Sequence, residues 1–380
     1  MVSNAKIRIL YGQKNGKCAL IGNFAESVDN FYKLMTERGK LFTATLVSLL
    51  CLNGYSQRPC ADISFDGLFD NREYKGDMIP QTIYGMRISP QMGIATDNHT
   101  LMAGFSKIWE FGSDEKIDPD IILYYKYQGK RWSTYFGAIP RQNLQRQLPD
   151  AFLYDSIAFF EPTIGGTVIQ YNGNSLQTEL YCNWFSRQAD TVREAFRIVW
   201  DGYAGSKTIG GGWYMAMTHF AKPKQRGHYI YEKFMFNPYL SLDLSGKVAP
   251  ELTLKANAGL LCSMVRCRKD GDWHTPAGFL GDIQLGWRMF DIKSTVYAGG
   301  SQQPFLDDTE AGMPFHRSDP FYNHTFYNRT ELGVMFVADR NVEFGFRWNL
   351  HFTPDTPVHN QQLITVRYRL NTDHLPRIHR

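Results

Sequence analysis

Apolar and polar residues alternate with a period of two in several stretches of the chain. In residues 342–352, VEFGFRWNLHF, apolar side chains occupy the even positions, and polar side chains or glycine occupy the odd positions. The same alternation recurs in residues 251–260, 282–289, 363–370 and 196–202. Because successive side chains of a β-strand point to opposite faces, the pattern predicts strands with one apolar and one polar face.

Sixteen such strands are predicted, and the connections between them alternate in length. The predicted starts lie near Ala61, Thr82, Thr100, Asp120, Arg131, Thr163, Ser175, Glu194, Thr208, Phe234, Pro250, Ala277, Ile292, Arg329, Val342 and Gln361. The short connections are residues 96–99, 129–130, 172–174, 205–207, 245–249, 290–291 and 338–341. The long connections lie near residues 75–81, 112–119, 140–162, 186–193, 221–233, 262–276, 301–328 and 353–360. An even number of strands with alternating short and long links is typical of an up-and-down membrane barrel.

The length of the strands favours a membrane barrel over a soluble sheet. The clearest segments run for nine to twelve residues, whereas strands of soluble proteins average about five or six. Large aromatic residues stand at the ends of the apolar faces, as in the interface girdles of membrane barrels. We therefore predict an all-β fold, a transmembrane antiparallel up-and-down β-barrel of about 16 strands with short periplasmic turns and long extracellular loops. The half-buried strands of a soluble sandwich also alternate, so this alternative stays open.

Some segments depart from the pattern. Lys107 falls on the lipid-facing side of the third strand, unless a bulge re-aims it. The sixth and ninth strands are rich in glycine and alternate poorly. A polar tail, residues 371–380, follows the last predicted strand.

Residues 39–57, GKLFTATLVSLLCLNGYSQ, have the features of an export signal. A positive flank precedes twelve uncharged residues, and small residues stand before Gln57. The apolar run is short of the roughly 20 residues that span a bilayer. We predict an upstream extension without structure at residues 1–34, a signal peptide at 35–56 and a single barrel domain at 57–380. A short buried helix and lipid attachment at Cys51 are the alternatives.

Charge and cysteine content narrow the function classes. Residues 1–56 hold seven basic and three acidic residues of the totals of 41 and 37, which leaves 34 of each in the rest of the chain. This balance argues against a nucleic-acid binder, which needs a basic face. Cys60, Cys182, Cys262 and Cys267 follow the leader; Cys262 and Cys267 can bridge within a loop, and no CxxC zinc pattern is present.

The chain resembles porin-like outer-membrane barrels, especially those of the Bacteroidota. The resemblance is carried by the GYSQ export site, the hairpin pattern over roughly residues 61–370, and the stretches FGAIPRQNL, LPDAFLYDSIAFFEP and DPFYNHTFYNRTEL. It implies the outer membrane of a Gram-negative bacterium, with membrane lipid and lipopolysaccharide around the barrel. It also implies small hydrophilic solutes as partners and a possible homotrimer, with no nucleic acid, cofactor or metal.

A barrel of sixteen strands leaves an aqueous channel, so its polar faces line water. The predicted pore-lining residues are Arg197, Asp201, Lys255, Asp282, Arg288, Glu343, Arg347, Arg367 and Arg369. These charges either pair and keep the wall wet, or form facing basic and acidic walls that select solutes by charge.

Two long loops carry candidate chemistry. Residues 140–162 are too apolar for a plain surface loop, so we expect them to fold into the bore, cap the barrel or contact a partner. Folded inward, the loop has a charged set that forms a constriction: Arg141, Arg146, Asp150, Asp155 and Glu161. Residues 301–328 hold carboxylates and histidines, which predict a solvated surface or, less readily, a calcium site.

These features together favour a porin-like channel for passive diffusion of small hydrophilic solutes. An outer-membrane enzyme or adhesin, or a soluble secreted β-sandwich that binds glycans, is the alternative. No GxSxG or HExxH motif occurs, and no spacing joins His219, His351 and Ser241. We therefore predict no catalytic residue.

Overall fold

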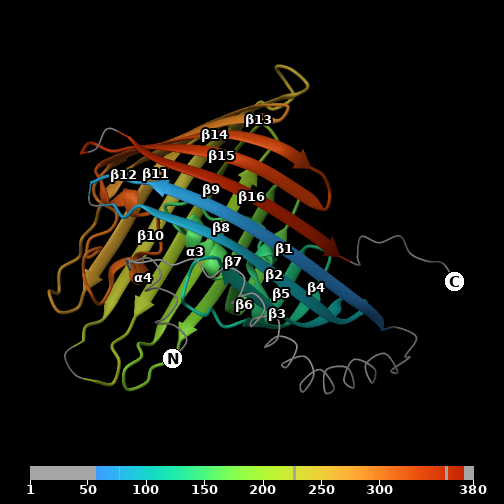
Figure 1. Cartoon of the computed structure of the whole chain (residues 1–380), viewed down its shortest axis with the longest axis horizontal. Coiled ribbons are helices and arrows are strands. Elements are labelled where there is room, and N and C mark those ends of the chain that lie inside the picture. Colours follow the sequence, from blue (N-terminus) through green and yellow to red (C-terminus); the bar gives the residue numbers. More distant parts are fainter. Residues whose placement is uncertain (1–56, 77, 226–227, 356–357, 372–380) are drawn as a thin grey trace.

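The computed structural model describes residues 57–371, except residues 77, 226–227 and 356–357. The predicted extension and signal peptide, and the tail after residue 371, lie outside the described residues. The described chain is a closed barrel of sixteen strands, and each strand pairs antiparallel with its neighbours in the sequence (Figure 1). The predicted fold class is confirmed.

The strands begin within three residues of their predicted starts. They are β1 Arg58–Glu73, β2 Gln81–Thr96, β3 His99–Glu110, β4 Asp120–Gln128, β5 Trp132–Pro140, β6 Thr163–Asn172, β7 Leu176–Ser186, β8 Ala195–Gly205, β9 Ile209–Phe220, β10 Tyr231–Asp243, β11 Leu252–Cys267, β12 Ala277–Trp287, β13 Phe290–Gly299, β14 Phe326–Ala338, β15 Val342–Phe352 and β16 His359–Asn371. The short helices η1 Arg141–Asn143, α3 Asp155–Phe160, α4 Gly312–His316 and η2 Pro320–Asn323 lie in two of the long connections. None of the helices in the described residues is long and apolar enough to cross a membrane.

The first and last strands close the barrel. β1 pairs with β16 from Asp62 opposite Asn371 to Glu73 opposite Asn360. Across this seam the Arg369 Nη2 atom lies 2.7 Å from the Asp62 Oδ2 atom. Closure gives every strand two hydrogen-bonded neighbours, so no open sheet edge meets lipid.

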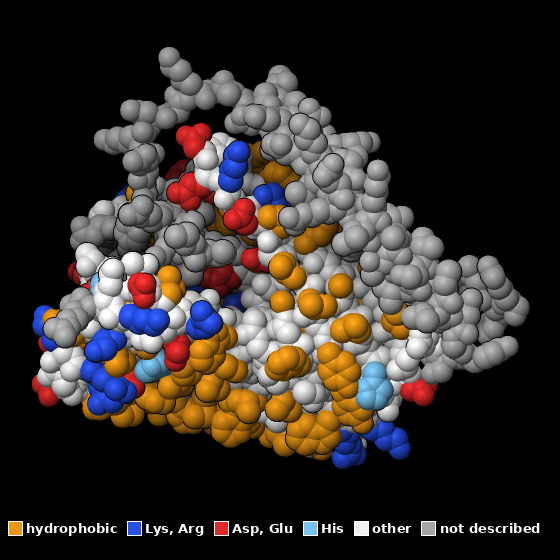
Figure 2. Space-filling model, turned by 90° about the horizontal axis from the view of Figure 1, so that it is seen from below, with side chains coloured by type: hydrophobic (Ala, Val, Ile, Leu, Met, Phe, Trp, Pro, Cys, Tyr) orange, Lys and Arg blue, Asp and Glu red, His pale blue; other side chains and the backbone are white. Residues whose placement is uncertain are grey.

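The apolar faces of the strands point outward. Ile283 in the middle of β12 is 60% exposed, and Phe136 of β5 is 66% exposed. Figure 2 shows hydrophobic side chains side by side over one wall, with charged side chains gathered toward its ends. The soluble sandwich is therefore excluded, because in a sandwich these rows would meet in a dry core.

The two predicted irregularities have physical causes. Lys107 does face outward, and its ammonium donates a hydrogen bond to the Ile117 carbonyl in the connection between β3 and β4. In β9, a Cβ atom at Gly212 would lie 2.4 Å from the Tyr239 hydroxyl oxygen. A tyrosine ring thus covers the position, and the alternation fails because only glycine leaves room for it.

Cys262 and Cys267, whose sequence spacing left a bridge open, do not form a disulfide. Both are free thiols within β11. They are five residues apart on an alternating strand and so point to opposite faces.

Candidate functional site

The connection between β5 and β6, residues 140–162, lies inside the barrel. On one side, the Arg146 Nη2 atom lies 3.0 Å from the Tyr214 hydroxyl of β9, and Arg197 of β8 donates to the Phe152 carbonyl over 2.8 Å. On the other side, Asp150 pairs with Arg329 of β14 at 2.6 Å. A loop that contacts β8, β9 and β14 crosses the bore, so it neither caps the barrel nor stays outside it.

The connection between β13 and β14, residues 300–325, also folds inward. Gln302, Ser318 and Asp319 of this loop are fully buried. The Asp319 amide donates to the Asp150 carbonyl over 2.9 Å. The two loops therefore form one plug, and Figure 1 shows the helices α3 and α4 drawn within the outline of the strands.

This burial corrects the prediction for residues 301–328. The loop is not a solvated surface, because its polar side chains bond inside the bore. Asp308, for example, accepts a hydrogen bond from the Tyr231 hydroxyl at 2.8 Å. Among the described residues no group of three or more His, Cys, Asp or Glu side chains is placed to hold a metal ion. The calcium alternative is therefore not supported.

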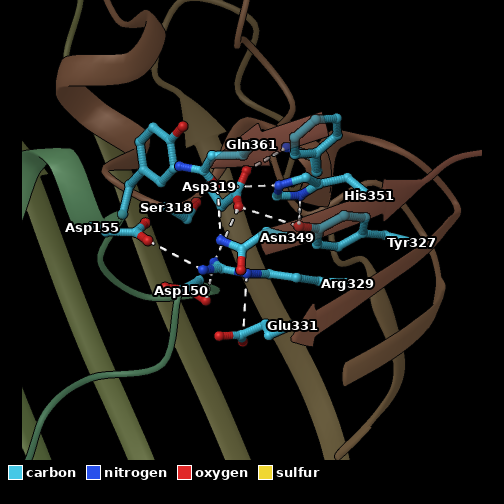
Figure 3. Close-up of polar contacts among 12 residues, drawn as sticks. Asp150, Asp155, Ser318, Asp319, Tyr327, Arg329, Glu331, Asn349, His351 and Gln361 are labelled. Carbon is cyan, nitrogen blue, oxygen red and sulfur yellow. Dashed lines mark hydrogen bonds and ion pairs between the residues drawn. The ribbon is translucent and has the colours of Figure 1, made fainter. Parts of the chain in front are cut away.

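Arg329 is the centre of a buried polar network that joins the plug to the wall (Figure 3). Its Nη1 atom lies 2.6 Å from Asp150 and 4.0 Å from Asp319, and its Nη2 atom lies 3.2 Å from Asp155. Its Nε atom lies 3.5 Å from Glu331, two residues along β14. One guanidinium thus serves four carboxylates from the two loops and the wall.

The network continues along the wall to β1. The Tyr327 hydroxyl lies 3.3 Å from Asp319 and 2.7 Å from the His351 Nδ1 atom. His351 Nε2 lies 3.2 Å from the Gln361 Oε1 atom, and the Gln361 amide donates to Asp70 over 2.9 Å. The hydrogen bonds therefore connect the plug with β14, β15, β16 and β1 across the seam.

Burial sets the protonation of the loop carboxyls. It raises the pKa of Asp319 to about 7, against the opposing attraction of Arg329. Burial likewise raises the pKa of Asp150 to about 6. For Asp155 burial acts in the same direction, but Arg329 and Arg72 outweigh it and lower the pKa. The three carboxyls around one guanidinium therefore carry different charge states near neutral pH.

The predicted constriction residues all lie at the plug. Arg146, Asp150 and Asp155 contact the wall as described. Arg141 and Glu161 stand at the base of the loop, 3.9 Å apart between Nη2 and Oε2, and Arg317 of the second loop also pairs with Glu161.

The predicted pore-lining residues occupy two levels of the bore. Arg197 and Asp201 are buried beneath the plug. The other inward-facing members lie toward the short turns and pair with nearby side chains: Lys255 with Asp243, Asp282 with Asn257, Arg347 with Glu331, Arg367 with Glu343 and with Asp66, and Arg369 with Asp62. Arg288 differs, because β12 ends at Trp287 and places it in the turn, where it pairs with Glu251 at 2.7 Å. Opposite charges are thus interleaved at this level.

The sequence interpretation missed the roles of Arg329, Arg317, Lys233 and Gln361. All four are buried inside the bore. The alternation is compatible with inward-facing positions for Arg329 and Gln361, whereas Lys233 falls in the predicted connection of residues 221–233 and lies in β10 in the structure. No local pattern indicates that a loop from elsewhere covers these side chains. The enzymatic candidates are not brought together: His219 faces outward beside Glu232, whereas His351 is buried in the network. No serine hydroxyl in the described part of the chain hydrogen-bonds a histidine ring.

Fold and site together define a class: an outer-membrane β-barrel of the porin type, with a bore narrowed by two inward-folded loops. Solved structures share this fold. They include a loop L8 deletion mutant of OmpT of Vibrio cholerae (8% identity, TM-score 0.51, 83% of this chain and 100% of that chain) and OpdL of Pseudomonas aeruginosa (12% identity, TM-score 0.51, 83% and 99%). OprD of Pseudomonas aeruginosa is also similar (10% identity, TM-score 0.50, 83% and 94%).

The sequence comparisons add one further likeness. A family model described as "Lipid A 3'-O-deacylase-type" matches residues 61–219. No curated protein matches the chain. The resemblance to porin-like barrels and the outer-membrane location are thus confirmed by the fold.

Proposed function

We propose that the protein is an outer-membrane channel for passive diffusion of small hydrophilic solutes. One observation carries this proposal: charged side chains line the inner wall near the short turns and remain open to water. The side chains of Lys255, Arg347 and Arg367 are 47%, 47% and 56% exposed, although all three point into the barrel. Such charges would be too costly in a dry core, so they indicate a wet lumen.

The plug determines which solutes pass. Residues 140–162 and 300–325 fill the half of the bore next to the long loops, so a solute must move between them or displace them. The polar contacts at Arg329 and Arg197 hold the first loop against opposite walls. We therefore expect a narrow, selective path and a small conductance.

Conductance of the purified protein in planar bilayers tests the proposal. Wild type should give discrete steps, and deletion of residues 143–160 should enlarge them several-fold, because the deletion removes most of the first loop from the bore. Deletion of the exposed residues 114–116 is the matched control and should leave the step size unchanged. Folded wild-type barrels that do not conduct would refute the channel.

A second candidate, hydrolysis of a lipid ester, has a specific observation in its favour. The matched deacylase-type region ends at His219, whose Nδ1 atom lies 3.7 Å from Glu232 on the outer wall. A histidine beside a carboxylate is the arrangement of a general base, but no nucleophile is hydrogen-bonded to it in the described residues. Incubation with lipid A followed by mass spectrometry separates the two functions. Acyl loss with wild type but not with His219→Ala would support the enzyme.

A further inference from the structure

An open cavity of about 770 Å³ lies on the outer wall of the barrel, beside the turn between β4 and β5. Its lining consists of three aromatic residues, two basic residues and a glycine: Tyr127, Trp132, Tyr171, Lys130, Arg131 and Gly129. Tyr127 shares its face of β4 with Ile121 and Leu123, which are 71% and 52% exposed. Because alternate residues of a strand point to one side, this is the lipid-facing side. The cavity therefore opens toward lipid at the end of the short turns, which is the periplasmic end.

Aromatic side chains form the walls of the cavity. The ring centroids of Trp132 and Tyr171 lie 4.8 Å apart, with an interplanar angle of 54°. The two residues are register partners on β5 and β6, so the pairing of the strands places their rings side by side. Tryptophan and tyrosine have an apolar ring and a polar group, and this combination favours the boundary between acyl chains and headgroups. The walls thus place the cavity at the level of the headgroups of the periplasmic leaflet.

The rim of the cavity is positively charged. Lys130 and Arg131 are exposed, and the Arg131 Nη1 atom lies 3.5 Å from the Tyr171 hydroxyl, which holds the guanidinium beside the aromatic wall. No aspartate or glutamate is among the described residues that line the cavity. Neither Lys130 nor Arg131 has a carboxylate within ion-pair distance in the part of the chain that the structure describes. The two charges are therefore available to an anion from outside the protein.

These surroundings favour an anionic headgroup that carries acyl chains. A guanidinium and an ammonium together match the oxygens of a phosphate. The ammonium of a zwitterionic headgroup, by contrast, would meet two cations and no carboxylate. Next to the cavity the lipid-facing rows continue with the register partners Tyr125 and Phe136, which are 41% and 66% exposed. A free phosphate would contact only the cations, whereas a phospholipid would also cover the rings and these apolar rows.

We propose that this cavity is a binding site for an anionic phospholipid of the periplasmic leaflet, such as phosphatidylglycerol. Lys130 and Arg131 contact the phosphate oxygens, and the rings of Trp132 and Tyr171 contact the glycerol backbone. The acyl chains follow the outer wall past Phe136. Basic pockets at a membrane surface recognise anionic headgroups in this way. The site lies outside the bore, so it does not depend on the proposed channel function.

Lipid titration of the purified protein in detergent, followed by native mass spectrometry, tests the site. Wild type should bind dioleoylphosphatidylglycerol more tightly than dioleoylphosphatidylethanolamine. The double variant Lys130→Gln, Arg131→Gln should bind phosphatidylglycerol about five- to twenty-five-fold more weakly, because each basic residue near an anionic lipid contributes roughly five-fold. Lys207→Gln with Arg340→Gln is the matched control, since it removes two exposed charges of the same kinds from two other short turns. This control should keep the affinity and the preference of wild type.

Three outcomes of this titration would overturn the proposal. Equal losses in the two glutamine double variants would show that the whole periplasmic end attracts anionic lipid without a site. Equal binding of both lipids by wild type would show that the headgroup is not recognised. Displacement of phosphatidylglycerol by glycerol 3-phosphate at equal concentration would show that the acyl chains do not contribute. Lys130→Arg with Arg131→Lys keeps both charges and should keep most of the preference, and the migration of unboiled protein on gels checks that each variant is folded.

Discussion

Arg329 shows how one residue can determine the position of a whole segment. It lies on β14, 179 positions from Asp150 in the sequence, and it is almost completely buried. A guanidinium can donate in several directions within one plane, so it serves carboxylates of both loops and of its own strand at once. The conformation of the plug therefore depends on a side chain outside the plug.

Replacement of Arg329 should destabilise the protein strongly. Arg329→Gln leaves Asp150 and Asp155 of the plug without their counter-ion on the wall, and breaking a buried pair in this way costs about 3–5 kcal/mol. Urea titration, with the folded form followed on unboiled gels, measures the loss. Arg347→Gln removes a half-exposed partner of Glu331 and should cost less than about 1 kcal/mol. Equal stability of both variants would show that the network does not hold the plug.

The pH dependence of the plug follows from Asp319 and Asp150. Their raised pKa values, about 7 and about 6, mean that the neutral carboxyls are favoured in the folded state. Their contribution to stability is complete below the ordinary pKa and is lost as the pH rises through the folded value. The pKa of Asp155 is lowered, so this residue changes the stability only at a pH below the ordinary pKa of an aspartate. That pH lies below the range in which Asp319 and Asp150 titrate.

We therefore expect the plug to be more firmly held at pH 5 than at pH 8. Hydrogen exchange of the backbone amides in residues 312–323 should be slower at pH 5 after correction for the intrinsic rate. Asp319→Asn is always neutral and should lose much of the difference. If Asp319→Asn keeps the full difference in amide exchange between pH 5 and pH 8, other groups cause the pH effect.

For single residues, the sequence predicts which face of a strand a side chain lies on. It predicts less well which other residues that side chain contacts. The alternation gave the correct face for Arg197, Asp201 and Lys255. It did not reveal that Arg197 is covered by Phe152, because contacts between residues far apart in the chain leave no local pattern. Arg288 was misplaced because β12 ends two residues before the alternation does.

The strands are the elements that could be predicted most fully. Each alternates because lipid and water select opposite side chains on its two faces, and this selection is visible in the sequence. The ninth strand shows the limit, since its glycines are explained by tyrosine rings from neighbouring strands. The loop of residues 140–162 was recognisable by its apolar side chains. The loop of residues 300–325 was not, because its buried carboxylates resemble a solvated surface.

The two faces of β12 should respond differently to the same substitution. Ile283→Lys places a charge on the lipid side of the strand centre and should cost about 2–4 kcal/mol. Gln284→Lys, one residue further, places it in the lumen and should cost little. Reversible unfolding in lipid bilayers with urea compares them. Similar losses would contradict the assignment of the outward face.

The closed barrel gives the whole molecule a measurable signature. Unboiled protein from the membrane fraction should migrate differently from boiled protein on a denaturing gel, because the hydrogen-bonded ring resists the detergent. Recovery from the soluble periplasmic fraction would contradict the fold's location. The homotrimer and the contact with lipopolysaccharide stay predictions, and an unboiled band at three times the mass would support the former.

The seam between β1 and β16 also has a consequence for biogenesis. β1 is exported early and β16 last, so the nascent sheet keeps two open edges until almost the entire polypeptide has been delivered. During that wait Asp62 lacks Arg369, and the exposed edges can pair with other chains. Loss of residues 359–371 would therefore leave a sheet that cannot be sealed, and the cell should hold it with chaperones or degrade it before insertion.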